Sequence, residues 1–133
     1  MTYKDLNDKE KLLKFLRKEL QSIIGACNKG TANMQTKTKP INEKIWKTLH
    51  ASFTKIIEEQ IRKQGKITPD ITATALMVHY CCSLVNLETR NEVVLYDYMD
   101  FSRRIGELWE SFCKTCWDYS VNPKIKSCLL YTS

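Results

Sequence analysis

The chain is poor in the two residues that most often break helices and form tight turns. Only four glycines and three prolines occur among its 133 residues, which argues against an all-β sandwich. No apolar run approaches the roughly 18 residues that cross a bilayer. The first residues, MTYKDLNDKEK, lack the apolar stretch of a secretory leader. We therefore expect no contact with a membrane.

The last six residues, CLLYTS, look like the translated adapter of a transposon-based sequencing library. Processing scars do not belong in fold reasoning. We expect residues 127–133 to be read-through of this kind, and residues 1–126 to form the helical N-terminal domain of a longer protein. A genuine short apolar tail is the alternative.

Cysteine usage indicates the compartment. Five of the six cysteines precede that tail, an odd number, and no secretion signal precedes them. This is typical of reduced thiols in a cytosol, so we predict a cytoplasmic protein. The five are Cys27, Cys81, Cys82, Cys113 and Cys116.

Apolar residues recur every three or four positions in several stretches, as in amphipathic helices. The first stretch covers residues 7–27, where Asn7 and Glu10 have the spacing of a capping box. Its stripe comprises Leu12, Leu16, Leu20, Ile23 and Cys27. Residues 28–42 show no period and contain Gly30 and Pro40, so we predict a loop. A loop of that length tends to be functional or disordered.

The second helix is predicted to begin at Asn42, which can cap free N–H groups, and to stop near Gly65. Its apolar face comprises Ile45, Leu49, Phe53, Ile56, Ile57 and Ile61. The third helix should begin with Thr68 as cap and Pro69 in the first turn, followed by Asp70, whose charge suits the helix dipole.

Residues 71–85 of the third helix are nearly all apolar or small, which predicts a helix buried on every side. We expect a polar turn over residues 86–91 and an extended connection over residues 93–96. A fourth helix then runs from Asp97 to a stop at Pro123. Its stripe comprises Phe101, Ile105, Leu108, Phe112, Cys116 and Tyr119. The fold class is all-α, a four-helix bundle-like domain with a buried central third helix.

No catalytic centre is predicted in this chain. His79 falls in the most apolar helix and is interpreted as a hydrogen-bonded core histidine, and His50 has no obvious Ser or Asp companion. Pro69-Asp70 begins like the PD…(D/E)xK motif of nucleases, but no acid-x-Lys follows it. We therefore interpret Asp70 as a helix-end charge.

No metal site is predicted either. Cys113 and Cys116 form a CxxC late in a helix, whereas redox pairs of this kind sit at helix N-termini. The alternative is a zinc site built from His79, Cys82 and the two CxxC cysteines. The simpler interpretation is that the cysteines are small apolar core residues.

Charge gives the best functional signal, with a net charge of +6. Lysines cluster across the predicted loop and the start of the second helix, against Glu43 alone, and two arginines occur early in the fourth helix. Contacts of this kind hold a DNA backbone without reading its sequence. The predicted nucleic-acid-binding residues are Lys29, Lys37, Lys39, Lys44, Lys47, Arg103 and Arg104. The alternative is a basic loop that only aids solubility.

Three stretches, IWKTLHASFTKIIEEQI, ITPDITATALMVHYCCSLVNLETR and YDYMDFSRRIGELWESFCKTCWDYS, resemble the helical N-terminal region of some type II restriction endonucleases. The likeness covers residues 41–126 and lies in texture and order, not in a diagnostic motif. It implies a non-catalytic helical part that precedes a catalytic α/β core, so no catalytic residue is carried over. A Mg²⁺ cofactor is implied only for such a downstream core.

Two functions follow as expectations. The first is the non-catalytic helical part of a DNA-acting enzyme, a restriction endonuclease, which contacts the DNA backbone and docks on a downstream domain of the same chain. The alternative is a helical protein-interaction module of a prokaryotic or phage protein.

Overall fold

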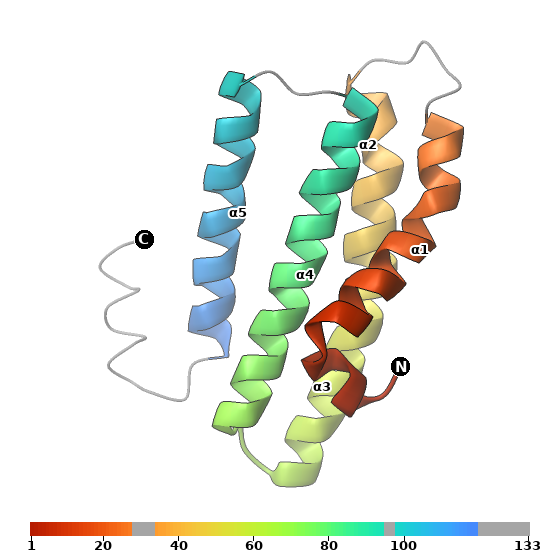
Figure 1. Cartoon of the computed structure of the whole chain (residues 1–133). Helices are drawn as coiled ribbons and strands as arrows, with labels where there is room; N and C mark the ends of the chain where they lie inside the picture. The colour runs from red at the N-terminus through yellow and green to blue at the C-terminus, as the bar shows by residue number, and fades with distance from the viewer. Residues whose placement is uncertain (28–33, 95–97, 120–133) are drawn as a thin grey trace.

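The computed structural model describes residues 1–27, 34–94 and 98–119, and every regular element within these ranges is a helix. Four helical rods pack side by side (Figure 1). The first rod is α1 (Lys9–Cys27), preceded by the short 3-10 helix η1 (Tyr3–Asn7). The predicted all-α, bundle-like fold is confirmed.

The second rod consists of three consecutive helices. These are α2 (Met34–Asn42), the π-helix η2 (Glu43–Leu49) and α3 (His50–Gln64). The rod ends at Gly65, whose backbone is left-handed with φ 73° and whose N–H donates to the Ile61 carbonyl at 2.8 Å. Glycine adopts this conformation without strain, so the predicted stop is confirmed.

The predicted loop over residues 28–42 is wrong from Met34 onward, and residues 28–33 lie outside the described part. Thr38 and Ile41 are buried where α2 packs on α4, and such packing overrides weak local propensity. Asn42 does not cap a helix, because its own backbone is helical (φ −59°, ψ −44°). Its side-chain oxygen instead accepts a hydrogen bond from Asn86 Nδ2 at 2.9 Å.

The π-helix explains how the second rod keeps its apolar side chains on one face. Buried residues recur at intervals of four: Ile41, Ile45, Leu49, Phe53 and Ile57. In an α-helix of 3.6 residues per turn, each step of four drifts by about 40°. The wider turns of a π-helix drift in the opposite sense. Pro40, which cannot donate a backbone hydrogen bond, lies just before this segment.

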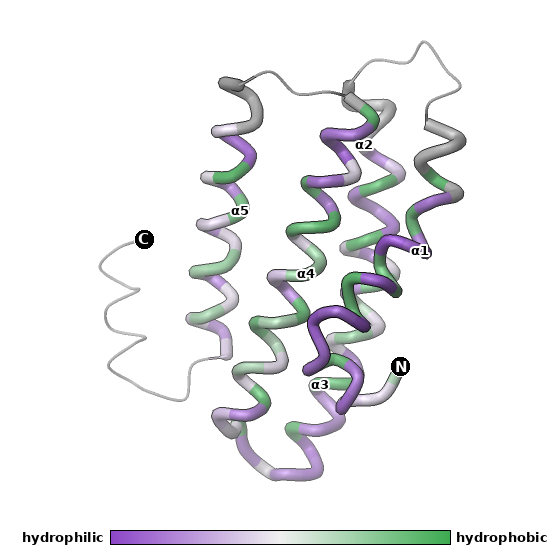
Figure 2. The backbone as a smooth tube through the Cα atoms, viewed as in Figure 1, coloured by the Kyte–Doolittle hydropathy of each residue, from purple (hydrophilic) through white to green (hydrophobic). Residues whose placement is uncertain are grey.

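The third rod, α4 (Pro69–Val94), is the central helix and contacts every other helical element of the described chain. Its buried apolar residues include Ile71, Ala75, Val78, Cys81, Cys82 and Val85, and hydrophobic segments recur along its middle (Figure 2). The Ile71 N–H donates to Thr68 Oγ1 at 3.3 Å. The predicted capping residue and the buried central helix are therefore confirmed.

The predicted turn over residues 86–91 is wrong, because α4 continues through it to Val94. Asn86 is buried and donates to Asn42 of the second rod, while Glu88 accepts two hydrogen bonds from Arg17 of α1. The polar side chains that suggested a turn thus form hydrogen bonds with side chains of neighbouring rods. Val93, predicted to be extended, is helical and buried, and residues 95–97 lie outside the described part.

The start of α1 also differs from the prediction. Asp8, not Asn7, caps the helix, since Asp8 Oδ1 accepts a hydrogen bond from the Lys11 N–H at 3.2 Å. Asn7 Oδ1 accepts from Thr74 Oγ1 of α4 at 2.7 Å. Asn7, which was predicted to cap α1, therefore links the N-terminal segment to the central helix α4 instead.

The fourth rod, α5 (Tyr98–Asp118), packs chiefly on α4. None of its described side chains is fully buried, and Ile105 of the predicted core stripe is 48% exposed. The expected stop at Pro123 and the start at Asp97 lie outside the described residues. None of the described helices combines the length and apolarity needed to cross a membrane.

Candidate functional site

Among the lysines predicted to bind nucleic acid, two of the three whose side chains the structure describes lie next to carboxylates. Lys29 and the side chain of Lys37 lie outside what the structure describes. Lys39 is exposed on α2. Lys44 Nζ lies 3.6 Å from Glu19 Oε2, and Lys47 Nζ lies 4.0 Å from Glu43 Oε1. The Lys44 pair is partly exposed and the Lys47 pair is exposed, and pairs open to solvent contribute little free energy. Both ammonium groups therefore remain able to exchange partners.

The two predicted arginines lie apart from these lysines. Arg103 and Arg104 belong to α5, which packs on one side of α4, whereas α2 packs on another (Figure 1). Arg104 pairs with Glu107 at 3.1 Å within its own helix. The described basic residues therefore form two regions, not one surface.

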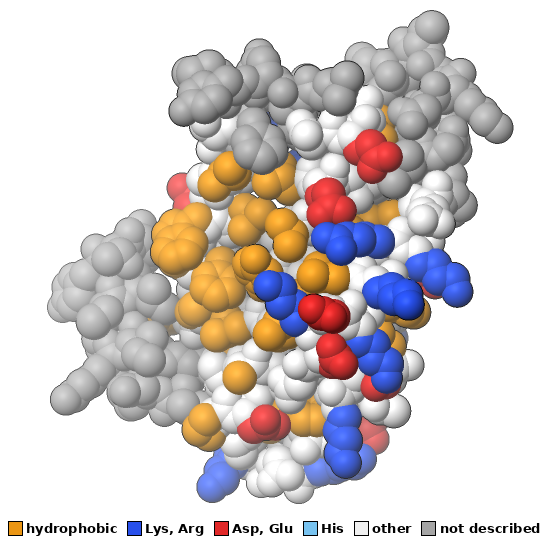
Figure 3. All heavy atoms as spheres, in the orientation of Figure 1, with side chains coloured by type: hydrophobic (Ala, Val, Ile, Leu, Met, Phe, Trp, Pro, Cys, Tyr) orange, Lys and Arg blue, Asp and Glu red, His pale blue; other side chains and the backbone are white. Residues whose placement is uncertain are grey.

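The exposed face of α1 is mixed in charge as well. Lys11 Nζ lies 2.7 Å from Asp5 Oδ1, and Arg17 makes two 3.0 Å hydrogen bonds to Glu88. Blue and red side chains lie next to each other over this helix in Figure 3. Positive charge is thus balanced locally by carboxylates on the face in view.

Two of the cysteines, Cys81 and Cys82, are core residues, whereas Cys113 and Cys116 are only partly buried. Among the described residues, no three His, Cys, Asp or Glu side chains come together in a way that could hold a metal. Cys81 and Cys82 are fully buried, and burial raises their pKa values to about 11 and about 12. Thiols of such high pKa are poor nucleophiles at neutral pH. The structure supports the simpler interpretation of these two residues.

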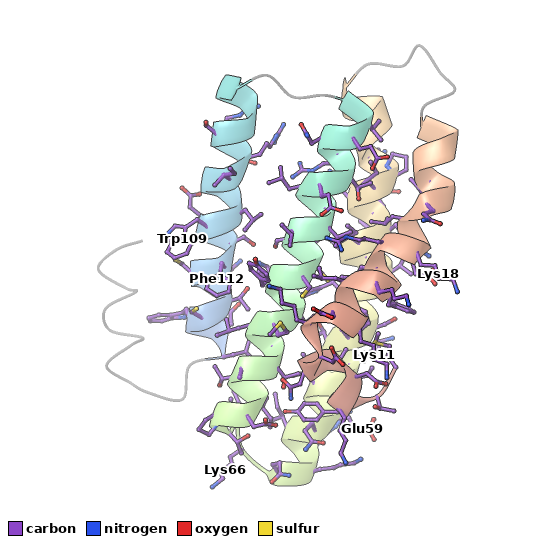
Figure 4. All side chains as sticks on the ribbon, viewed as in Figure 1. Lys11, Lys18, Glu59, Lys66, Trp109 and Phe112 are labelled. Carbon is purple, nitrogen blue, oxygen red and sulfur yellow. The ribbon has the colours of Figure 1, made fainter. Side chains whose placement is uncertain are left out.

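α5 carries an apolar surface that includes two residues of the predicted core stripe, Ile105 and Phe112, and also Trp109, which was not part of that stripe. Trp109 is 65% exposed and stacks on Phe112, with ring centroids 6.0 Å apart, and Ile105 lies one turn before Trp109. In Figure 4, Trp109 lies at the outer edge of the molecule and the half-buried Phe112 lies beside it on α5, on the opposite side from Lys11 and Lys18 of α1. We call Ile105, Trp109 and Phe112 the α5 surface.

The spacing of these three residues along the sequence cannot show whether their face of the helix is buried in the core or exposed to solvent. Ile105, Trp109 and Phe112 recur at intervals of four and three, which predicts one helical face. Because α5 packs chiefly on α4, Ile105 and Trp109 remain exposed in the described part of the chain. Gly106 adds to the opening, because nothing lies within 4 Å of the position where its side chain would begin.

A second candidate site contains both histidines, His50 and His79. His79 of α4 is buried, and its Nε2 lies 2.8 Å from Ser111 Oγ of α5. His50 faces it from α3, with ring centroids 5.8 Å apart. The prediction of a hydrogen-bonded core histidine is confirmed for His79. Its serine partner lies 32 residues away, so no local sequence pattern could have identified it.

These residues line a partly open cavity of about 310 Å³ between the second rod, α4 and α5. Burial lowers the pKa of His50, and burial followed by the charge of His50 lowers that of His79 to about 4. Both imidazoles are therefore neutral at neutral pH. A base of such low pKa is a weak general base, so the Ser111–His79 pair is better suited to binding than to nucleophilic catalysis.

Comparisons with protein-family models, with curated proteins and with solved structures give no match.

Proposed function

We propose that the chain is a helical protein-interaction module, and that its α5 surface pairs with the same surface of a second copy. The observation that carries the proposal is the 65% exposure of Trp109 beside the exposed Ile105. Large aromatic side chains at the centre of a patch supply most of the binding energy of protein interfaces. A soluble monomer rarely leaves contiguous apolar groups of this kind uncovered.

The geometry of α5 favours a symmetric pair. A two-fold axis brings identical surfaces together, so the surface must complement itself. In an antiparallel pair of α5 helices that cross near Glu107, Trp109 of each copy lies opposite the open position at Gly106 of the other. A large side chain then fills a hole left by a small one, as in knobs-into-holes packing.

Sedimentation analysis over a concentration series tests this proposal. We expect reversible association in the range of about 1–200 µM and its loss in the Trp109→Ser variant. Tyr80→Ser is the matched control, because it removes an exposed aromatic ring of α4 that Lys9 already covers at 5.4 Å. A wild-type chain that stays monomeric throughout, or a Trp109→Ser variant that still associates, contradicts the proposal.

The second candidate is the non-catalytic part of a DNA-acting enzyme, as implied by the resemblance to restriction endonucleases. The net charge of +6 and the exposed Lys39 and Lys47 on the second rod support it. Phosphates would displace the weak lysine–glutamate pairs. In this proposal the α5 surface docks on another domain of the same protein, and Mg²⁺ belongs to that domain. The four described free cysteines are compatible with work in the cytosol.

A salt-dependent gel shift tests DNA contact. Replacing Lys39, Lys44 and Lys47 with Ala should weaken binding and lower the salt slope by up to about 3. The matched control replaces Lys55, Lys63 and Lys66, which lie on α3 and just beyond it, and so removes the same charge elsewhere. Equal weakening by both triple variants assigns the effect to net charge and removes the lysines of α2 and η2 from the proposal.

A further inference from the structure

We propose that the cavity between the second rod, α4 and α5 binds an uncharged, planar nitrogen heterocycle of bicyclic size. This function is separate from the pairing proposed for α5. The proposal rests on the volume of the cavity, on the aromatic rings of its wall and on the polar atoms that those rings and α5 present.

The volume sets the size of the ligand. The cavity measures about 310 Å³, roughly twice the 150 Å³ of an engineered cavity that accepts benzene. A fused two-ring compound with one or two small substituents therefore fits. Because the cavity is partly open and includes the exposed side chains Lys114 and Asp118, a ligand can enter without the bundle coming apart.

Three aromatic rings form one wall. Trp46 of the π-helix lies 5.1 Å from His50 and 5.4 Å from His79 between ring centroids, and the two imidazoles lie 5.8 Å apart, nearly perpendicular. Centroid distances of this size allow offset or edge-on contacts. A flat ligand extends the same packing, whereas an aliphatic one of equal volume does not.

The polar atoms select a ligand that both donates and accepts hydrogen bonds. A neutral imidazole has one donor and one acceptor nitrogen, and Ser111 Oγ lies at 2.8 Å from His79 Nε2. Thr54 lines the cavity beside His50, with Oγ1 3.4 Å from Nδ1. Ring nitrogens of a heterocycle can accept hydrogen bonds from such imidazole and hydroxyl groups, and its exocyclic amines can donate to them.

The charges disfavour ions. Lys114 and Asp118 carry opposite charges and belong to the same turn of α5, so together they give the cavity no net sign. The groups deeper in the wall are uncharged, including Val78 and Ile57, which are 1% and 2% exposed. Moving an ion next to such groups is costly unless a counter-ion accompanies it.

Histidine resonances give a direct test, because the chain contains only two histidines and both line the cavity. Adenine, added to ¹³C-histidine-labelled protein, is the probe, and benzoate is a charged compound of similar size. We expect adenine to shift both imidazole signals with a saturable dependence below about 1 mM, and benzoate to bind at least about tenfold more weakly. No saturable shift with adenine up to about 5 mM, or equal binding of benzoate, overturns the proposal.

A pair of serine variants locates the binding. Ser111→Ala removes the hydroxyl that faces His79 and should weaken adenine binding by about tenfold. Ser102→Ala removes an exposed hydroxyl from the same helix and should leave it unchanged. Amide spectra confirm that each variant is folded. Unchanged binding in folded Ser111→Ala protein overturns the assignment to this cavity.

Discussion

The central helix α4 and the outer helix α5 have similar apolar content in the sequence but very different surroundings. α4 contacts every other described element, and most of its described apolar side chains are buried. α5 packs chiefly on α4 and has no fully buried side chain among its described residues. The difference teaches that burial in this bundle depends on how many neighbouring helices a helix has, and that an apolar stripe alone does not define a core.

Truncating one buried side chain of the α1–α4 interface should have the largest effect on stability. Leu16→Ala removes a side chain that is 0% exposed, which should lower the free energy of unfolding by about 3–5 kcal/mol. Leu108→Ala, at a half-buried site of α5, should cost only about 1 kcal/mol. Chemical denaturation measures both, and equal losses would erase the contrast between the two helices.

Acidification should loosen the contact between α4 and α5. The folded pKa of His79 is about 4, below the 6.5 of an unfolded histidine, so the unfolded chain binds more protons between these values. The stabilisation is complete above pH 6.5 and is lost as pH falls toward 4, by roughly 2–3 kcal/mol. His50 contributes in the same sense. Unfolding free energies measured from pH 7.5 to 4 should show this in the wild type and much less in His79→Gln.

One hydrogen bond ties the beginning of α4 to the end of α5. Thr72 Oγ1 donates to the Tyr119 carbonyl oxygen. Thr72→Val keeps the shape of the side chain but removes the donor, which should cost about 1 kcal/mol. Amide exchange should become faster in α5 and stay unchanged in α1. Faster exchange in both helices would mean that α5 does not open on its own.

The ion pair between Arg17 and Glu88 should have the smallest effect. It is bidentate at 3.0 Å, but the two side chains are 50% and 45% exposed. Arg17→Gln should therefore change the free energy of unfolding by at most about 0.5–1 kcal/mol, and less at high salt. A loss as large as that of Leu16→Ala would indicate that α1 is fastened by charge and not by its leucines.

Local sequence patterns predicted correctly those features that depend on the local backbone and composition alone. The stop at Gly65, the cap at Thr68 and the central, largely buried position of residues 71–85 follow from backbone conformation and composition, and all are confirmed. The expected burial on every side is wrong at Ala73 and Tyr80, which are exposed. Asn42 and Asn86 each suggest a break when considered alone. They are 44 residues apart and satisfy each other inside the bundle, so no local pattern could reveal that both lie within helices.

The same limit applies to the candidate sites. The exposure of Trp109 depends on which rod lies next to α5, and the meeting of His50, His79 and Ser111 depends on three rods at once. The spacing of residues along the chain predicts neither the exposure of Trp109 nor the proximity of the two histidines and Ser111. The predicted DNA contacts of the lysines and arginines remain predictions, because pairing with nearby carboxylates does not decide whether phosphate binds.

The π-helix of the second rod also bears on how the length of this chain can change over evolution. A π turn holds an extra residue relative to an α turn. One residue deleted within Glu43–Leu49 lets the segment wind as an α-helix while the flanking faces keep their direction. The same deletion in α4 rotates everything beyond it by about 100° and turns buried side chains away from their present neighbours. Related chains should therefore differ in length at η2 and keep α4 constant.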